Sequence, residues 1–180
     1  NGVPLEEVFG GLMAALADGS RDHGISADLI VCFLRDLGAD AADAVLRACL
    51  PFRDKFIGVG LDSAEVGYPP ALFSEVYRQA AAEGLRLVAH AGEEGGPDYV
   101  REALDELHVE RIDHGVRSME DPELVARLRA EQIPLTVCPL SNVALRVVGT
   151  LGDHMLPGML DAGLLATVNS DDPAYFGGYV

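Results

Sequence analysis

Ionisable side chains that can bind metals or move protons stand where apolar segments of this sequence end. They are His90, Glu93, His114, Asp171 and Asp172. Histidine and carboxylate groups are the usual protein ligands of divalent metals and the usual general acids and bases. Two adjacent carboxylates in a buried site are unfavourable unless a cation or a ligand proton compensates them. A divalent metal bound by His90 and Asp171 would do so and would leave Asp172 free to bind a substrate.

Each of these groups also has an ordinary structural explanation. A histidine followed by glutamate is common at the polar end of a strand, and paired aspartates before proline often cap a turn. A single histidine such as His114 is more often packed and hydrogen-bonded than a ligand. Cys138 is expected to be a core thiol, and the other histidines are expected on the surface: His23, His108 and His154. The metal-site interpretation depends on all of the groups converging.

Strand-like and helix-like segments alternate along the chain, as in α/β proteins. The predicted strands are 28–34, 56–61, 85–90, 111–114, 135–138 and 164–169, and the predicted helices are 5–17, 70–83, 97–107 and 122–131. A doubly wound sheet that binds nucleotides would carry a glycine-rich phosphate loop after its first strand, and none follows any strand here. Polar residues at the carboxyl ends of several strands instead favour a (β/α)₈ barrel. Six strands do not close one, so we predict a partial TIM-like barrel of about six βα units.

Length and composition limit the classes of function. The 180 residues suit a single domain, and 49% of them are hydrophobic, enough for a large core. The 13 basic and 29 acidic residues give a net charge of −16, which makes nucleic acid and anionic membranes poor partners. Three cysteines without a CxxC pair argue against a disulfide framework, so a cytoplasmic location is expected.

Four motifs, in this order, resemble those of the adenosine/adenine deaminase family of zinc-dependent barrels. They are HAGE at 90–93, DHG at 113–115, CPLSN at 138–142 and NSDDP at 169–173. The resemblance extends from about residue 25 to residue 180. Glu65, Asp113 and the run 141–148 are similar to the branch that acts on the free base adenine.

The resemblance implies a role for each candidate residue. His90 and Asp171 would bind Zn²⁺, and Glu93 would be the protonated acid that gives a proton to a purine ring nitrogen. His114 would orient and polarise the water held by zinc, and Asp172 would hold the imidazole side of the purine. Ser141 and Asn142 would shape the pocket wall. The implied reaction is hydrolytic deamination of adenine to hypoxanthine and ammonia in purine salvage.

Two further zinc ligands of the family come from an HxH motif on its first strand, and this sequence has no HxH. The first predicted strand resembles the third strand of the family, so we expect a single partial domain over 1–180, truncated at both ends and inactive alone. Deamination of adenosine or another 6-substituted purine, and a non-catalytic purine-binding fragment, stay open. The zinc deaminases that use HxE and PCxxC are excluded because 108–110 spells HxE but no PCxxC exists. The sequence gives no oligomeric state.

Overall fold

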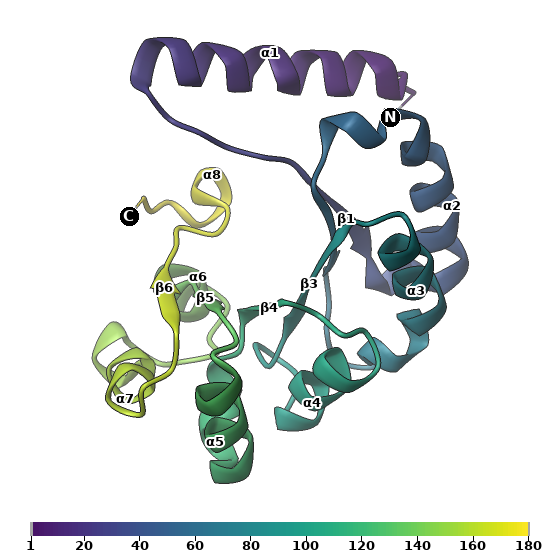
Figure 1. Ribbon diagram of the computed structural model, residues 1–180. Helices are drawn as coiled ribbons and strands as arrows, with labels where there is room; N and C mark the ends of the chain where they lie inside the picture. Colours follow the sequence, from purple (N-terminus) through teal and green to yellow (C-terminus); the bar gives the residue numbers. More distant parts are fainter. Residues whose placement is uncertain (1, 180) are drawn as a thin grey trace.

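The computed structural model describes residues 2–179, in which six parallel strands form one curved sheet (Figure 1). The strands are β1 (Ile30–Leu34), β2 (Gly58–Asp62), β3 (Arg86–Ala91), β4 (Arg111–His114), β5 (Leu135–Val137) and β6 (Ala166–Val168). Each strand pairs in parallel with the next one along the chain, so the order in space is the order in sequence. This is the partial TIM-like α/β fold that the sequence predicted.

Helices connect the strands and lie mainly on the outer, convex side of the sheet (Figure 1). The α-helices are α1 (Leu5–His23), α2 (Ala39–Cys49), α3 (Ser74–Ala82), α4 (Pro97–Asp105), α5 (Pro122–Glu131), α6 (Pro139–Ala144), α7 (Leu156–Asp161) and α8 (Pro173–Phe176). The 3₁₀ helices are η1 (Arg35–Leu37), η2 (Leu50–Lys55), η3 (Pro70–Phe73), η4 (Val116–Glu120) and η5 (Leu151–Asp153). Helix α1 crosses above the open side of the sheet in the view of Figure 1 and contacts η2.

Apolar side chains of the strands and of the helices that cover them form one core. Val76, Val100 and Leu124 come from three successive helices, and each is buried against the sheet. In α5 the Asp121 carboxylate accepts hydrogen bonds from the Glu123 and Leu124 amides, as expected of an N-cap residue before a proline. The core therefore fixes the sheet while caps and prolines fix where the helices begin.

The first helix is longer than the sequence predicted. Helix α1 continues past Gly19 to His23 and ends at Gly24, whose backbone is left-handed (φ 65°). The Gly24 amide donates to the Ser20 carbonyl and the Ile25 amide to the Gly19 carbonyl, which closes the helix. A glycine costs a helix about 1 kcal/mol but does not end it unless the chain turns there. Helix α2 was not predicted, although its buried residues Ala42, Leu46 and Cys49 recur at helical spacing.

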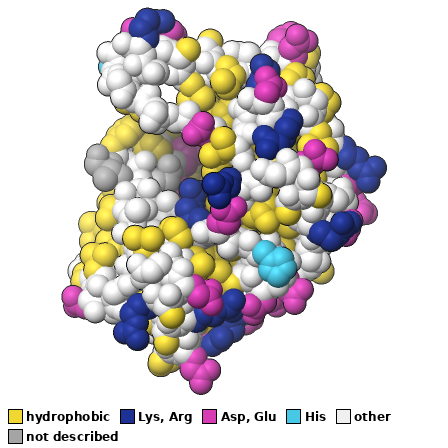
Figure 2. Space-filling model, viewed as in Figure 1, with side chains coloured by type: hydrophobic (Ala, Val, Ile, Leu, Met, Phe, Trp, Pro, Cys, Tyr) yellow, Lys and Arg dark blue, Asp and Glu magenta, His cyan; other side chains and the backbone are white. Residues whose placement is uncertain are grey.

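No described helix is long and apolar enough to cross a membrane. On the face shown in Figure 2, basic side chains are scattered among acidic ones, and the surface is hollowed below α1. The carboxyl ends of the strands lie at one edge of the sheet, and the register of β3 and β4 places His90 beside Asp113 and Ala91 beside His114. The fold therefore brings the predicted site residues to a common edge.

Candidate active site

His90 lies near the carboxyl end of β3, and the Nδ1 atom of its ring points towards two hydrogen-bond acceptors. Its Nδ1 atom lies 2.9 Å from Asp62 Oδ1 and 3.2 Å from the Leu61 carbonyl oxygen. Since both neighbours are acceptors, the proton of the ring belongs on Nδ1, which leaves the Nε2 lone pair available. Burial opposes protonation, but the hydrogen bond and charge of Asp62 outweigh it and raise the pKa of His90 to about 9. A cation on Nε2 would therefore replace a proton.

The loop after β3 turns sharply at Gly92, and only glycine fits there. Its backbone is left-handed (φ 74°), and an added Cβ would lie 2.6 Å from Val100 Cγ2. Glu65, buried with 2% of its surface exposed, then holds the loop from below. Its Oε2 accepts hydrogen bonds from the amides of Glu93 (3.1 Å), Glu94 (2.7 Å) and Gly95 (2.6 Å). This loop geometry fixes where the Glu93 side chain begins.

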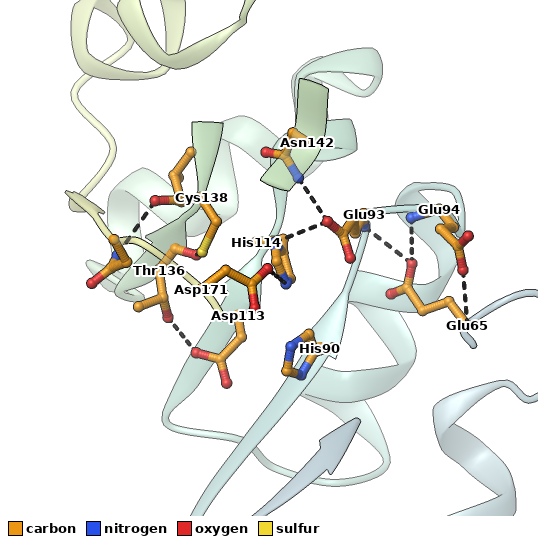
Figure 3. A network of polar contacts seen from close by, with 12 residues as sticks. Glu65, His90, Glu93, Glu94, Asp113, His114, Thr136, Cys138, Asn142 and Asp171 are labelled. Atoms are coloured by element: carbon orange, nitrogen blue, oxygen red, sulfur yellow. Dashed lines mark hydrogen bonds and ion pairs between the residues drawn. The ribbon is translucent and has the colours of Figure 1, made fainter. Parts of the chain in front are cut away.

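The Glu93 carboxylate lies among polar side chains with little access to water. Asn142 Nδ2 donates to its Oε1 at 2.7 Å, and His114 Nδ1 lies 3.3 Å from the same oxygen (Figure 3). Burial raises the pKa of Glu93 to about 7, with a further contribution from the charges of Asp171 and Glu65, against the lowering effects of His90 and Asn142. Glu93 is therefore a carboxylic acid that holds its proton near neutral pH.

His114 ends β4 in a strained backbone conformation. Its φ of 68° is in the left-handed region, which is costly for a residue with a side chain and recurs at functional sites. The ring is 2% exposed and lies 4.7 Å, centroid to centroid, from the ring of His90. Burial, together with the charge of His90, lowers the pKa of His114 to about 4. This imidazole is neutral and can accept a proton.

The two aspartates after β6 have different surroundings. Asp171, also left-handed (φ 59°), places Oδ2 3.9 Å from His114 Nε2, so that His114 stands between Asp171 and Glu93 (Figure 3). Asp172 is exposed and caps α8, where its Oδ1 accepts a hydrogen bond from the Tyr175 amide at 3.2 Å. The structure therefore brings together His90, Glu93, His114 and Asp171, while Asp172 lies outside this group.

A cavity of about 460 Å³, within the range of small-molecule sites, opens beside these residues. His90, His114, Cys138 and Asp171 line it, together with Asp113. Cys138 is buried as predicted, but it faces this cavity as well as the core. The cavity is where a small substrate would meet the two histidines.

Asp113 lies on β4 one residue before His114 and pairs in register with His90 of β3. Its Oδ1 accepts a hydrogen bond from Arg111 Nε at 2.9 Å and another from the Thr136 hydroxyl. Arg111 precedes Asp113 by two residues on β4, so both side chains lie on the same face of the strand. Asp113, which lines the cavity, is therefore held in place by its neighbours.

Sequence reasoning missed two supports of the Glu93 loop and side chain. The sequence singled out Glu65 as similar to the branch that acts on adenine, whereas its buried carboxylate accepts hydrogen bonds from the backbone of residues 93–95. His154 was expected on the surface, and this was wrong: it is 7% exposed and its Nε2 lies 3.1 Å from Asn142 Oδ1. The Leu156 amide, two residues further along the chain, donates a hydrogen bond to His154 Nδ1. This short spacing did not by itself predict that His154 is buried.

The donor atoms present fit a zinc ion in part. His90 Nε2 is free while Nδ1 faces a carboxylate and a carbonyl, the arrangement typical of metal-bound histidines. Within residues 2–179, one group of donor atoms lies within 4.8 Å of one another: those of His114, Cys138 and Asp171. Asp171 is thus close enough to a second donor for the two to bind one metal ion. The histidine in this group is His114, whereas the predicted zinc ligand was His90. Burial raises the pKa of Cys138 to about 12, which disfavours the thiolate a metal needs.

Comparison with known proteins gives one consistent result. Residues 1–180 match the family model described as adenosine deaminase. An adenine deaminase of Streptomyces coelicolor is 65% identical over 178 residues, covering 99% of this chain and 52% of its own length. The chain spans about half the length of the curated relatives it matches.

Solved structures agree with the sequence relatives. The crystal structure of an adenine deaminase from Arthrobacter aurescens is 59% identical, with a TM-score of 0.96, over 99% of this chain and 55% of that one. An amidohydrolase from Burkhoderia ambifaria with bound Zn is 35% identical, with a TM-score of 0.89, over 97% of this chain and 50% of that one. These matches bear out the predicted fold.

Proposed function

The chain belongs to the adenosine deaminase family, and we propose that the protein that contains it converts adenine and water to hypoxanthine and ammonia. Support comes chiefly from the adenine deaminases that are 57–65% identical over 99% of this chain. These relatives favour adenine over the adenosine and non-catalytic alternatives. The site adds the chemical groups that this reaction requires.

Glu93 supplies the acid in this scheme. Attack of water at the carbon that bears the amino group pushes electrons onto the purine ring, and a ring nitrogen must then take up a proton. A carboxylic acid with a pKa of about 7 holds its proton at neutral pH and can give it to that nitrogen. The hydrogen bond from Asn142 keeps the carboxyl group in place while the proton moves.

His114 supplies the base. Its ring is neutral, and its Nδ1 has no hydrogen-bond partner among the described residues. Nε2 lies 3.9 Å from Asp171 Oδ2, too far for a direct hydrogen bond. The ring can accept a proton from the attacking water and later pass it towards the departing ammonia.

We assign His90 and Asp171 as the zinc ligands that this chain contributes, with the other protein ligands coming from outside residues 1–180. When bound, zinc would act as a Lewis acid that lowers the pKa of water towards about 7. Asp172 is assigned to the imidazole side of the purine, a contact that requires it to exchange its hydrogen bond at α8 for one to the substrate.

An assay of ammonia release from adenine and adenosine by the full-length protein tests the proposal. We expect kcat/KM for adenine to exceed that for adenosine by about a hundredfold or more, because unpaired ribose hydroxyls in a base-sized pocket are costly. Glu93→Gln should retain zinc but lose at least about 99% of the turnover, since an amide cannot replace a carboxylic acid as proton donor. Equal use of the two substrates would contradict the assignment of adenine.

A further inference from the structure

We propose that His154 and Asn142 are positioning residues that fix which carboxyl oxygen of Glu93 carries the proton given to the substrate. The inference rests on the proposed role of Glu93 as the acid. It adds two residues, neither of them in contact with the reacting atoms, that act on the reaction through Glu93. His154 lies between η5 and α7, and Asn142 lies in α6, so the chain of contacts joins two separate segments of the fold.

The hydrogen-bond chain begins at the backbone of α7. The Leu156 amide, in the first turn of that helix, donates to His154 Nδ1 at 3.0 Å. A backbone amide can only donate, so Nδ1 must be the unprotonated nitrogen, and the ring hydrogen lies on Nε2. Burial lowers the pKa of His154, which agrees with a neutral ring. The helix terminus therefore selects one tautomer of His154.

That tautomer determines the orientation of the Asn142 amide. His154 Nε2 lies 3.1 Å from Asn142 Oδ1, and since Nε2 bears the hydrogen it donates to this oxygen. The amide nitrogen must then point the other way, where Nδ2 donates to Glu93 Oε1 at 2.7 Å. Asn142 is 0% exposed, so no water competes for either end of the amide. A flipped amide would place two donors against each other on the His154 side.

The orientation of Asn142 in turn distinguishes the two oxygens of Glu93. In a protonated carboxyl group the carbonyl oxygen is the better acceptor and the hydroxyl oxygen is the donor. Oε1 receives the Asn142 hydrogen, so the proton is favoured on Oε2. Figure 3 shows Oε1 towards Asn142 and His114, while the second oxygen points away from Asn142, on the side where His90 lies. The proton is thus presented on the side of His90, away from Asn142.

A purely structural role would be simpler: His154 caps α7 and Asn142 fills space. Two measurements distinguish this structural role from the proposed positioning role: the tautomer of His154, and whether its substitution changes kcat more than KM. We expect ¹⁵N NMR of histidine-labelled full-length protein to show His154 with Nε2 protonated and Nδ1 unprotonated throughout pH 6–8. Loss of the signal in His154→Gln assigns it. A charged ring, or a proton on Nδ1, would overturn the proposal.

Kinetics of matched variants provide the second test. His154→Phe keeps a ring but no donor, and we expect kcat for adenine to fall about tenfold with KM changed less than about twofold. His154→Gln offers an amide hydrogen to Asn142 Oδ1 and should recover most of that loss. His23→Phe, an exposed histidine in α1, is the matched control and should leave kcat unchanged.

The outcomes separate the two proposals. A folded His154→Phe variant with wild-type kcat would overturn the positioning role, and so would a His154→Gln variant no better than His154→Phe. If the wild-type protein released no ammonia from adenine, the proposed function would fail instead. The tautomer of His154 would still decide whether the hydrogen-bond chain exists.

Discussion

His90 and His114 lie side by side, yet their surroundings give them opposite charge states. Asp62 raises the pKa of His90 to about 9, while burial and the charge on His90 lower the pKa of His114 to about 4. Placing a positive charge on two neighbouring imidazoles in a buried site is unfavourable. His90, which lies next to the Asp62 carboxylate, therefore carries the charge. The same asymmetry suits a division of labour in which His90 binds a cation and His114 accepts protons.

Zinc retention in single variants tests this division at the level of residues. His90→Ala and Asp171→Ala should each lower the zinc content of the full-length protein, because both are assigned as ligands. Cys138→Ser should retain zinc, since the buried thiol is neutral and is not assigned as a ligand. Asp172→Ala should also retain it. Metal analysis of the purified proteins that shows equal loss in all four variants would contradict the assignment.

The raised pKa of Glu93 predicts a pH dependence of stability in the metal-free protein. A carboxyl group whose pKa rises from 4.5 to about 7 on folding stabilises the fold below pH 4.5, and this contribution is lost as the pH rises to about 7. The loss amounts to about 3 kcal/mol, at 1.36 kcal/mol per pKa unit. Glu93→Gln should therefore match wild type near pH 4.5 and be more stable at pH 8.

Chemical denaturation at the two pH values measures this difference. The variant at low pH is its own control, because glutamine resembles the protonated glutamate in shape and charge. A Glu93→Gln protein that is no more stable than wild type at pH 8 would show that folding does not raise the pKa of Glu93.

At the scale of elements, one carboxylate organises the loop that carries the acid. Glu65 receives three backbone amides from residues 93–95, and its Oε1 lies 3.9 Å from Nη1 of the fully buried Arg35. Arg35 Nη1 also donates to the His90 carbonyl oxygen at 2.8 Å. The loop from β3 to α4 therefore depends on residues that precede it by about 30 and 55 positions.

Removing Glu65 should release this loop. Glu65→Ala leaves a buried guanidinium without its partner, which costs about 3–5 kcal/mol. Hydrogen exchange at the amides of Glu93, Glu94 and Gly95 should become much faster, as measured by mass spectrometry of the loop peptide. Glu102→Ala is the matched control, because Glu102 also accepts one backbone amide, that of Ala71, but at an exposed position. Unchanged exchange rates in Glu65→Ala would show that Glu65 does not hold the loop of residues 93–95 in place.

At the scale of the whole molecule, the sheet is open. Among the described residues, β1 and β6 each have a strand partner on one side only. Apolar side chains are exposed on both, with Leu34 on β1 and Val168 on β6. Unpaired edges with apolar side chains favour association with other chains. The cavity is open as well, and its described lining residues come from β3–β6 and the segments that follow them.

An isolated polypeptide of these 180 residues should therefore differ from the full-length protein. It should bind zinc far more weakly, because two assigned ligands are fewer than the three or four of protein zinc sites. It should also show no deaminase activity and elute at a size that grows with concentration. Zinc titration, an ammonia assay and size-exclusion chromatography measure these properties. Tight stoichiometric zinc binding with turnover would contradict the ligand assignment.

Local patterns in the sequence were sufficient to predict the class of fold and much of the candidate site. Buried parallel strands are short apolar runs, and polar residues at their carboxyl ends stand out against them. The bounds of β4 were therefore predicted to the residue, and those of the other strands to within two residues. The motifs predicted four of the side chains that the fold brings together, His90, Glu93, His114 and Asp171, because these residues lie next to such strand ends in the chain.

The surroundings of those residues could not be predicted, because they come from distant parts of the chain. Glu65 is 28 positions from Glu93, and His154 reaches Glu93 through Asn142, so no local pattern links them. The pKa values of His90 and His114 differ because of burial and the placement of one carboxylate, and neither is visible in the spacing of residues. Sequence patterns reveal properties that repeat along the chain or depend on close neighbours, such as strands, helices and short motifs. Charge states and hydrogen-bond chains depend instead on which distant segments the fold brings into contact.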